Sequence, residues 1–429
     1  MTIATFKGDA PARTGRAGRT GRTGRAARPA AVRRTWIGSA REALDRPLTT
    51  YYLLLTSAAL LLTIGLVMVL SASSVFSFRA TGDSYTIVRR QVVWVLVGCL
   101  GAFAASRVNT RWVRRLAYPA FGLSLVLLGL TAIFGVEING NQNWLAIGPL
   151  QIQPSEIAKL SMIVWAANIY ANKERRLDEV HHMVVPVVPG LLMAVALVVV
   201  GRDLGTALVL AAIMIGMLWI VGAPARLFVA LTGFIGLVAA GFALTDSERL
   251  GRVTTFLDPF QDFHGTGWQP AHGLYAMASG GIFGQGIGAS QQKWGALPEA
   301  HTDFIFAVLG EELGLVGTLL VIALFFTLAF AALRIARQST DPFVRYAAFG
   351  VMVWLLFQMM INVGMVLAML PVIGIPLPLV SYGGSSLLPT MAALGMLVGF
   401  ARREPAAARA LAQRRRQRSA GIAGRSARR

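Results

Sequence analysis

The segment 293-KWGALPEAHTDFIFAVLGEELG-314 decides the fold, because its polar first half runs directly into a long apolar stretch. The polar half carries four ionisable side chains, and the apolar half carries two more, Glu311 and Glu312. Such a junction is typical of a chain entering a membrane. Ionisable groups are costly at that depth, so they are retained for pairing or for function.

The composition supports a membrane protein. The chain has 429 residues, of which 55% are hydrophobic and only 14% charged, and its mean hydropathy is +0.60. A soluble protein carries about 25% charged residues. Many apolar runs reach the roughly 20 residues that cross a bilayer as a helix. The sequence therefore predicts an all-α integral membrane protein and excludes a soluble enzyme.

Ten apolar segments are predicted to span the membrane, and a polar loop over residues 246–303 separates the seventh from the eighth. The eighth is too long for one plain span, so its start lies at the interface or the helix is tilted. The predicted spans are 50–73, 90–106, 113–135, 153–171, 184–201, 203–222, 226–245, 304–333, 344–369 and 383–401.

The basic residues predict the orientation. Most of the 40 lysines and arginines fall on one side when both termini are placed in the cytoplasm. The long loop 246–303 is then extracellular. Residues 1–48 and 403–429 are predicted to be disordered basic tails around a membrane domain at 49–402. The net charge of +20 is interpreted as attraction of these tails to anionic lipids, and no nucleic-acid-reading pattern is present.

Asp303 is the leading candidate for catalysis, since it lies where the long outer loop becomes a helix. Either it caps that helix, or, as a partly desolvated carboxylate beside Glu299 and His301, it acts as a general base. For Glu311 and Glu312, pairing with another helix is the simpler interpretation.

A second polar cluster opens the fourth predicted span. Ser155, Glu156 and Lys159 share one face of a helix. Lys159 either pairs with Glu156 or reaches another helix or a phosphate group. At the next connection, Asp203 is a candidate helix cap and Arg202 a candidate phosphate ligand.

Three outer loops have distinctive sequences. The run 280-GGIFGQGIG-288 is interpreted as a flexible loop, because no parallel sheet surrounds it to make a phosphate cradle. The run NGNQNW, with Trp144 as a stacking face, either binds a sugar or forms a plain turn. The run PLPLVSYGGSS predicts a re-entrant or broken-helix element; its candidate substrate-binding residues are Ser381, Gly383, Gly384 and Ser385.

No metal-binding spacing of histidine or cysteine is present among the five histidines and one cysteine. A phosphate-rich substrate would bring Mg²⁺ or Mn²⁺ to aspartate and glutamate oxygens. A divalent cation of unspecified identity is therefore the one cofactor expected, and no organic cofactor is expected.

The motifs QPSEIAKL, RDLGTALV, QKWGALPEAHTDFIFAVLGEELG and PLPLVSYGGSS occur in one order over residues 50–402. In that order and spacing the chain resembles the SEDS family of bacterial envelope proteins (shape, elongation, division and sporulation). The segment before Asp303 is more similar to the division branch than to the elongation branch. The chain departs from the family at Arg202, where proline is frequent.

The resemblance implies a peptidoglycan glycosyltransferase that polymerises lipid II at the outer face of the bacterial cytoplasmic membrane, at the division septum. It implies a class B penicillin-binding protein and other divisome membrane proteins as partners. It places the family's essential aspartate at Asp303, its intramembrane lysine at Lys159 and its Pro-Glu glutamate at Glu299. Lys159, Arg202 or Lys293, or a bound cation, would offset the charge of the leaving pyrophosphate.

Two other functional classes stay open on the sequence. A lipid II flippase also carries intramembrane ionisable groups and broken helices, but it predicts an internal repeat and polar groups near the midplane. No repeat is found, and the polar residues are biased outwards. A scaffold that activates a partner synthase is the third hypothesis.

Overall fold

A computed structural model describes residues 46–138, 140–148, 150–244 and 247–413. Its helices and strands are α2 Thr49–Thr81, α3 Thr86–Arg107, α4 Thr110–Phe134, β1 Val136–Ile138, β2 Asn141–Ile147, β3 Leu150–Ile152, α5 Pro154–Lys173, η1 Glu174–Arg176, α6 Val180–Val184, α7 Val187–Val200, α8 Leu204–Ile220, α9 Ala225–Leu244, α10 Ser247–Thr255, α11 Trp268–Ser279, η2 Gln292–Trp294, α12 Ile305–Gln338, α13 Pro342–Val366 and α14 Gly384–Arg403.

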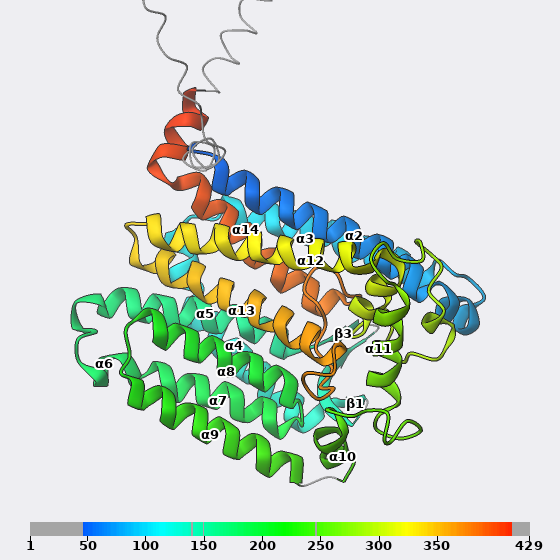
Figure 1. The fold of residues 1–429 in the computed structure, drawn as a ribbon. Helices are drawn as coiled ribbons and strands as arrows, with labels where there is room; N and C mark the ends of the chain where they lie inside the picture. Colours follow the sequence, from blue (N-terminus) through cyan, green and yellow to red (C-terminus); the bar gives the residue numbers. More distant parts are fainter. Residues whose placement is uncertain (1–45, 139, 149, 245–246, 414–429) are drawn as a thin grey trace, which may run out of the picture. The chain divides into compact units, whose positions relative to one another are not determined.

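Each of the ten predicted spans coincides with a helix of this described part, and Figure 1 shows these helices packed side by side. Eight candidate spans are long and apolar enough to cross a membrane, one of them formed by α6 and α7 together. Of the other two helices, α8 is apolar but has only 17 residues, and α5 has 20. The predicted multi-pass helical fold is confirmed, whereas the count of ten crossings and their orientation stay predictions.

The centre of the bundle is formed by α5 and α13. Helix α5 packs against α4, α8, α13 and α14, and α13 also packs against α8 and α12. Most polar residues of α5 as far as Tyr170 are buried, including Glu156 and Lys159. Polar side chains in these helices therefore need partners inside the protein.

The polar connections gather at one end of the bundle, where β1, β3, α10 and α11 lie (Figure 1). The NGNQNW connection forms a three-stranded antiparallel sheet in the order β1-β2-β3, an element that the all-α prediction missed. The long loop contains α10, α11 and η2.

Helix α12 is broken at Gly314, whose backbone has φ 66° and ψ −164°. The eighth predicted span is longer than one plain crossing because it contains two consecutive helices. The first, shorter helix carries Glu311 and Glu312. Residues 405–413, within the stretch 403–429 predicted as a tail, form a further helix. The predictions for residues 1–45 and 414–429 lie outside the described residues.

Candidate active site

Asp303 lies in the turn that precedes α12, and it does not cap that helix. The N-cap residue is Phe304, and no side chain caps the first turn. The carboxylate of Asp303 accepts no hydrogen bond from any residue that the structure describes, although the side chain is half-buried. Burial, and then the negative charges of Glu299 and Asp203, raise the pKa of Asp303 to about 7. Such a group accepts a proton efficiently near neutral pH.

The backbone on which Asp303 sits is fixed by three consecutive carbonyl groups. The backbone N–H of Tyr382 donates to His301 O at 3.0 Å. The hydroxyl of Ser381 donates to Thr302 O at 2.7 Å, and Asn362 Nδ2 donates to Asp303 O at 2.8 Å. A turn held at three successive residues leaves the Asp303 side chain little freedom except rotation about its own bonds.

Glu299 and His301 lie on the same turn, as predicted. Glu299 is exposed and adopts a left-handed backbone with φ 52°, and its carbonyl accepts from the N–H groups of Thr302 and Phe304 at 3.1 Å. The His301 ring stacks on Phe76 with centroids 5.3 Å apart. Burial lowers the pKa of His301 against the opposing effect of Glu299, which favours the neutral ring.

Lys159 is buried in a polar cluster, with 1% of its surface exposed. Its Nζ donates to Glu156 Oε1 at 2.7 Å and to Gln358 Oε1 at 3.0 Å. It also lies 5.4 Å from the centre of the Trp354 ring, within cation–π range. Glu156 Oε2 and Ser155 Oγ are buried without a hydrogen-bond partner. The predicted Glu156–Lys159 pair is thus present, with unused polar atoms beside it.

Asp203 caps α8, as predicted, and its carboxylate has further hydrogen-bond partners. Its Oδ1 accepts from the Thr206 backbone at 2.9 Å. Its Oδ2 accepts from Asn143 Nδ2 at 2.8 Å and from Gln153 Nε2 at 3.2 Å. The carboxylate therefore ties β2 and the start of α5 to α8.

Two other residues of this region that were predicted to contact substrate, Arg202 and Trp144, do not take part in the hydrogen bonds of Asp203. Arg202 is exposed, has φ 61° and makes no ion pair within the described residues. Trp144 is half-buried on β2, opposite Val136. Both are available to a ligand, and the hydrogen bonds that fix the Asp303 turn come from other residues.

Lys293 lies in a separate buried cluster with Glu311 and Glu312. Its Nζ donates to Glu312 Oε1 at 3.1 Å, Ser71 Oγ at 3.0 Å and Gly288 O at 2.7 Å. These three acceptors match the three N–H donors of an ammonium group, which leaves none for a substrate phosphate. The Glu311 carboxylate accepts hydrogen bonds from two groups of the outer loop, Ser290 Oγ and the backbone N–H of residue 291. Both glutamates thus pair with a loop, with Ser71 of α2 as the helix contact.

The Gly-rich run 280–288 is not a free loop, because it fills the break in α12. The carbonyls of Gly281 and Ile282 accept from the N–H groups of residues 315 and 316, and residues 285 and 286 donate to the carbonyls of residues 311 and 312. A Cβ at Gly284 would lie 2.1 Å from Glu312 O. Its glycines therefore permit close packing of backbone on backbone, and the flexible-loop interpretation is wrong.

The PLPLVSYGGSS segment is largely buried and irregular as far as Gly383, and α14 begins at Gly384. The re-entrant or broken-helix crossing expected of it stays a prediction. Gln91 of α3 brackets it, donating to Ser381 O at 3.3 Å and accepting from Gly383 N at 3.2 Å. Gly383 has φ 154°, and a Cβ at Gly384 would lie 2.4 Å from the Trp94 ring. Ser381 is buried and braces the Asp303 turn.

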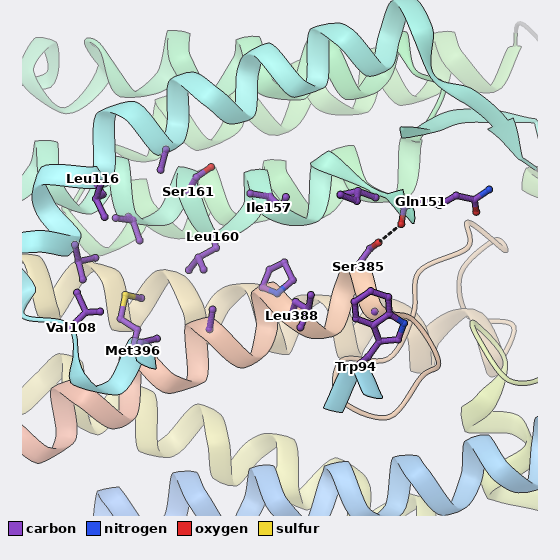
Figure 2. A pocket seen from close by; sticks show the side chains of 18 residues that line it. Trp94, Val108, Leu116, Gln151, Ile157, Leu160, Ser161, Ser385, Leu388 and Met396 are labelled. Carbon is purple, nitrogen blue, oxygen red and sulfur yellow. Dashed lines mark hydrogen bonds between the residues drawn. The ribbon is translucent and has the colours of Figure 1, made fainter. Parts of the chain in front are cut away.

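An apolar groove of about 640 Å³ lies between α3, α4, α5 and α14. Figure 2 shows Gln151, Ser385 and Trp94 at one end and Val108, Leu116 and Met396 at the other, with Ser385 Oγ donating to Gln151 O at 3.3 Å. Gly384 and Ser385 are thus the members of the predicted glycine-serine set that line the groove. Along α14 the groove extends from residue 384 to residue 396, about 18 Å at 1.5 Å per residue.

Sequence reasoning missed the side-chain amides that hold this site together, at positions 91, 143, 153, 358 and 362. The signal was available for Gln358 and Asn362, which stand four residues apart inside an apolar span. Within the described residues, no group of three His, Cys, Asp or Glu side chains is arranged to hold a metal ion.

Comparisons with known proteins identify the family of this chain. A family model described as "Cell cycle protein", which covers FtsW, RodA and SpoVE, matches residues 51–405. The chain is 39% identical over 382 residues to the probable peptidoglycan glycosyltransferase FtsW of Mycobacterium tuberculosis, covering 87% of this chain and 73% of that protein.

Solved structures show the same fold. A chain from a study titled "Structural coordination of polymerization and crosslinking by a peptidoglycan synthase complex" aligns with a TM-score of 0.67 and 30% identity, over 82% of this chain and 97% of that chain. The rod shape determining protein RodA of Thermus thermophilus aligns with a TM-score of 0.62 and 30% identity, over 82% and 96%. This chain is therefore a member of the FtsW, RodA and SpoVE family of cell cycle proteins.

Proposed function

We infer that this chain is a peptidoglycan glycosyltransferase, as its FtsW relatives are named. We propose that it polymerises lipid II, a disaccharide-pentapeptide carried on a polyprenyl pyrophosphate, and that it belongs to the division branch of the family. The observation that carries the mechanism is Asp303, a carboxylate without a hydrogen bond from the described residues, with a raised pKa, on an immobilised turn.

Asp303 acts as the general base. It takes the proton from the 4-hydroxyl of the acceptor sugar as that oxygen attacks C1 of the donor sugar. The new glycosidic C–O bond forms while the bond from C1 to the pyrophosphate breaks, and the pyrophosphate leaves with its electron pair. A positioned base of this kind contributes about 10²–10⁴ in rate.

Charge on the departing pyrophosphate needs a cation. Lys159 supports this role because only two of its three N–H donors have acceptors among the described residues, and polar atoms of Glu156 and Ser155 beside it are unpartnered. A bound Mg²⁺ or Mn²⁺ would neutralise the same charge. Since the described residues offer no three-residue ligand cluster, such an ion would be held mainly by substrate oxygens.

The apolar groove supports a lipid-linked substrate. Its walls come from four helices predicted to cross the membrane, and its polar end at Gln151 and Ser385 lies beside the segment that braces the Asp303 turn. A polyprenyl chain lying in the groove would leave its charged head at that end. The groove therefore supplies binding energy at a distance from the reacting atoms, which can be used to position them.

The multi-pass chain lies in a membrane, and we propose the bacterial cytoplasmic membrane at the division septum. A class B penicillin-binding protein is the proposed partner, in keeping with the similarity to a synthase complex that couples polymerization and crosslinking. Other divisome membrane proteins, and anionic lipids at the basic tails, complete the proposed set of partners.

The test combines purified full-length chain, the transpeptidase partner and labelled lipid II. We expect glycan polymer from the wild type and from Asp258→Ala, an exposed aspartate of the same outer loop, and none from Asp303→Ala of equal fold and partner binding. Lipid translocation without polymer would establish the flippase instead. Full polymerisation by Asp303→Asn would refute the base role.

A further inference from the structure

Two buried amides of α13 connect Asp303, Lys159 and one loop. Asn362 Nδ2 donates to Asp303 O at 2.8 Å and to Ile375 O at 2.7 Å. Gln358 Nε2 donates to Pro376 O at 2.9 Å, and Gln358 Oε1 accepts from Lys159 Nζ at 3.0 Å. Residues four apart share one face of a helix, so both amides contact adjacent carbonyls of the loop 371–383.

The orientation of Gln358 is fixed by its partners. Its Oε1 accepts from Lys159 and also from Trp354 Nε1 at 2.7 Å. Rotating the amide by 180° would place its NH₂ group against two donors and its oxygen against the Pro376 carbonyl. Since every contact needs the one orientation, Gln358 links the lysine to the loop rigidly.

Asn362 is retained at a cost in stability. The residue is 0% exposed, and its Oδ1 has no hydrogen-bond partner among the described residues. A buried polar atom without a partner is unfavourable, and a leucine of similar volume would not introduce one. An apolar residue would lack the two N–H donors of Asn362, which donate hydrogen bonds to the Asp303 turn and to the loop.

We propose that Asn362 and Gln358 are positioning residues for glycosyl transfer, which together hold Asp303 and Lys159 at a fixed separation through the loop 371–383. Neither side chain touches the reacting atoms. This inference rests on the proposed function, and it adds that the base and the cation act as one rigid unit carried on α13.

The test measures polymerisation by Asn362→Leu, Asn362→Ala and Gln358→Leu across a pH range. We expect kcat to fall about 10²-fold for the Asn362 variants, the size of loss that follows displacement of a reacting group by about 1 Å, with KM nearly unchanged. Gln358→Leu should lose about tenfold, equivalent to about 1.4 kcal/mol. Loosening the turn should also admit water to Asp303, so the acid limb of the pH profile should move to lower pH.

Asn168→Ala is the matched control, because Asn168 is another buried amide that accepts from Arg114 Nε at 2.9 Å. It should lower the melting temperature but leave both kcat and the pH midpoint at wild-type values. A second readout is hydrogen exchange, which should be faster at residues 371–383 in the Asn362 variants only.

Outcomes for the two proposals differ. Wild-type polymer together with wild-type kcat, pH midpoint and loop exchange in both Asn362 variants would overturn this inference alone. A fall in activity that only matches the loss of folded protein would also overturn it. No polymer from the wild type with its partner would overturn the proposed function, and this inference with it.

Discussion

Two buried lysines of this protein have nearly the same primary contact and different surroundings. Lys159 lies 2.7 Å from Glu156, and Lys293 lies 3.1 Å from Glu312. In both pairs the glutamate leaves Oε2 without a hydrogen-bond partner. The difference lies in the lysines, because the ammonium of Lys293 has three acceptors and that of Lys159 has two.

The surroundings of the two pairs differ. Lys293 ties the outer loop to α2 and α12, and every contact around it joins elements of the fold. Lys159 contacts Gln358, which reaches the loop that braces Asp303. A buried ion pair is therefore weak evidence of function by itself. The direction of its remaining contacts separates a structural pair from one that faces a reaction.

The largest loss of stability should follow from replacing only the lysine of either ion pair. Lys159→Met and Lys293→Met each leave a buried carboxylate uncompensated, and we expect each to lose about 3–5 kcal/mol of unfolding free energy. Thermal unfolding in one detergent measures both. A loss below about 1 kcal/mol at either site would show that its pair is hydrated rather than buried.

Replacing both members of a pair should separate the two roles. Lys293→Met with Glu312→Leu should regain stability and keep polymerase activity, because apolar groups can fill the space of an ion pair. Lys159→Met with Glu156→Leu should regain stability but lose about 10²–10³ in kcat, the usual effect of removing one group that stabilises developing charge. Equal activities of the two double variants would remove the distinction.

The pH profile of polymerisation should distinguish the two regions. With a pKa of about 7 for Asp303, activity should rise with pH to a midpoint near 7 as the base loses its proton. Glu299→Gln removes a negative charge that raises this pKa, so the midpoint should move lower. The Lys293 and Glu312 double variant should keep the wild-type midpoint, as measured by initial rates between pH 5 and 9.

The smallest effect concerns stability at Asp303 itself. Its folded pKa exceeds the ordinary value of 3.8, so the wild type loses stability as pH rises through 3.8 to about 7, while the unfolded chain releases a proton that the folded chain retains. The Asp303→Asn variant does not lose stability in this way, because its amide does not titrate. The variant should therefore unfold at a higher temperature than wild type above pH 7, and the difference should shrink towards pH 4.

Much of the fold followed from the sequence alone. Apolar runs of spanning length located the ten helices, because a bilayer requires that length, although α2 extends eight residues beyond the predicted end at residue 73. The motifs located the Asp303 turn, the Glu156–Lys159 pair and the irregular segment that ends at Gly383. The sheet at β1–β3 and the break at Gly314 were missed, since two of the three strands have only three residues and a glycine in an apolar run does not predict a break.

The role of each polar residue was decided by tertiary structure. Sequence placed Lys159 and Lys293 in one class of candidates, and Ser381 beside Ser385, because the residue type is the same in each pair. Their partners come from segments up to 222 residues away, as for Lys293 and Ser71. A hydrogen bond depends on distance and angle between two groups, and a linear pattern of residues fixes neither across different helices.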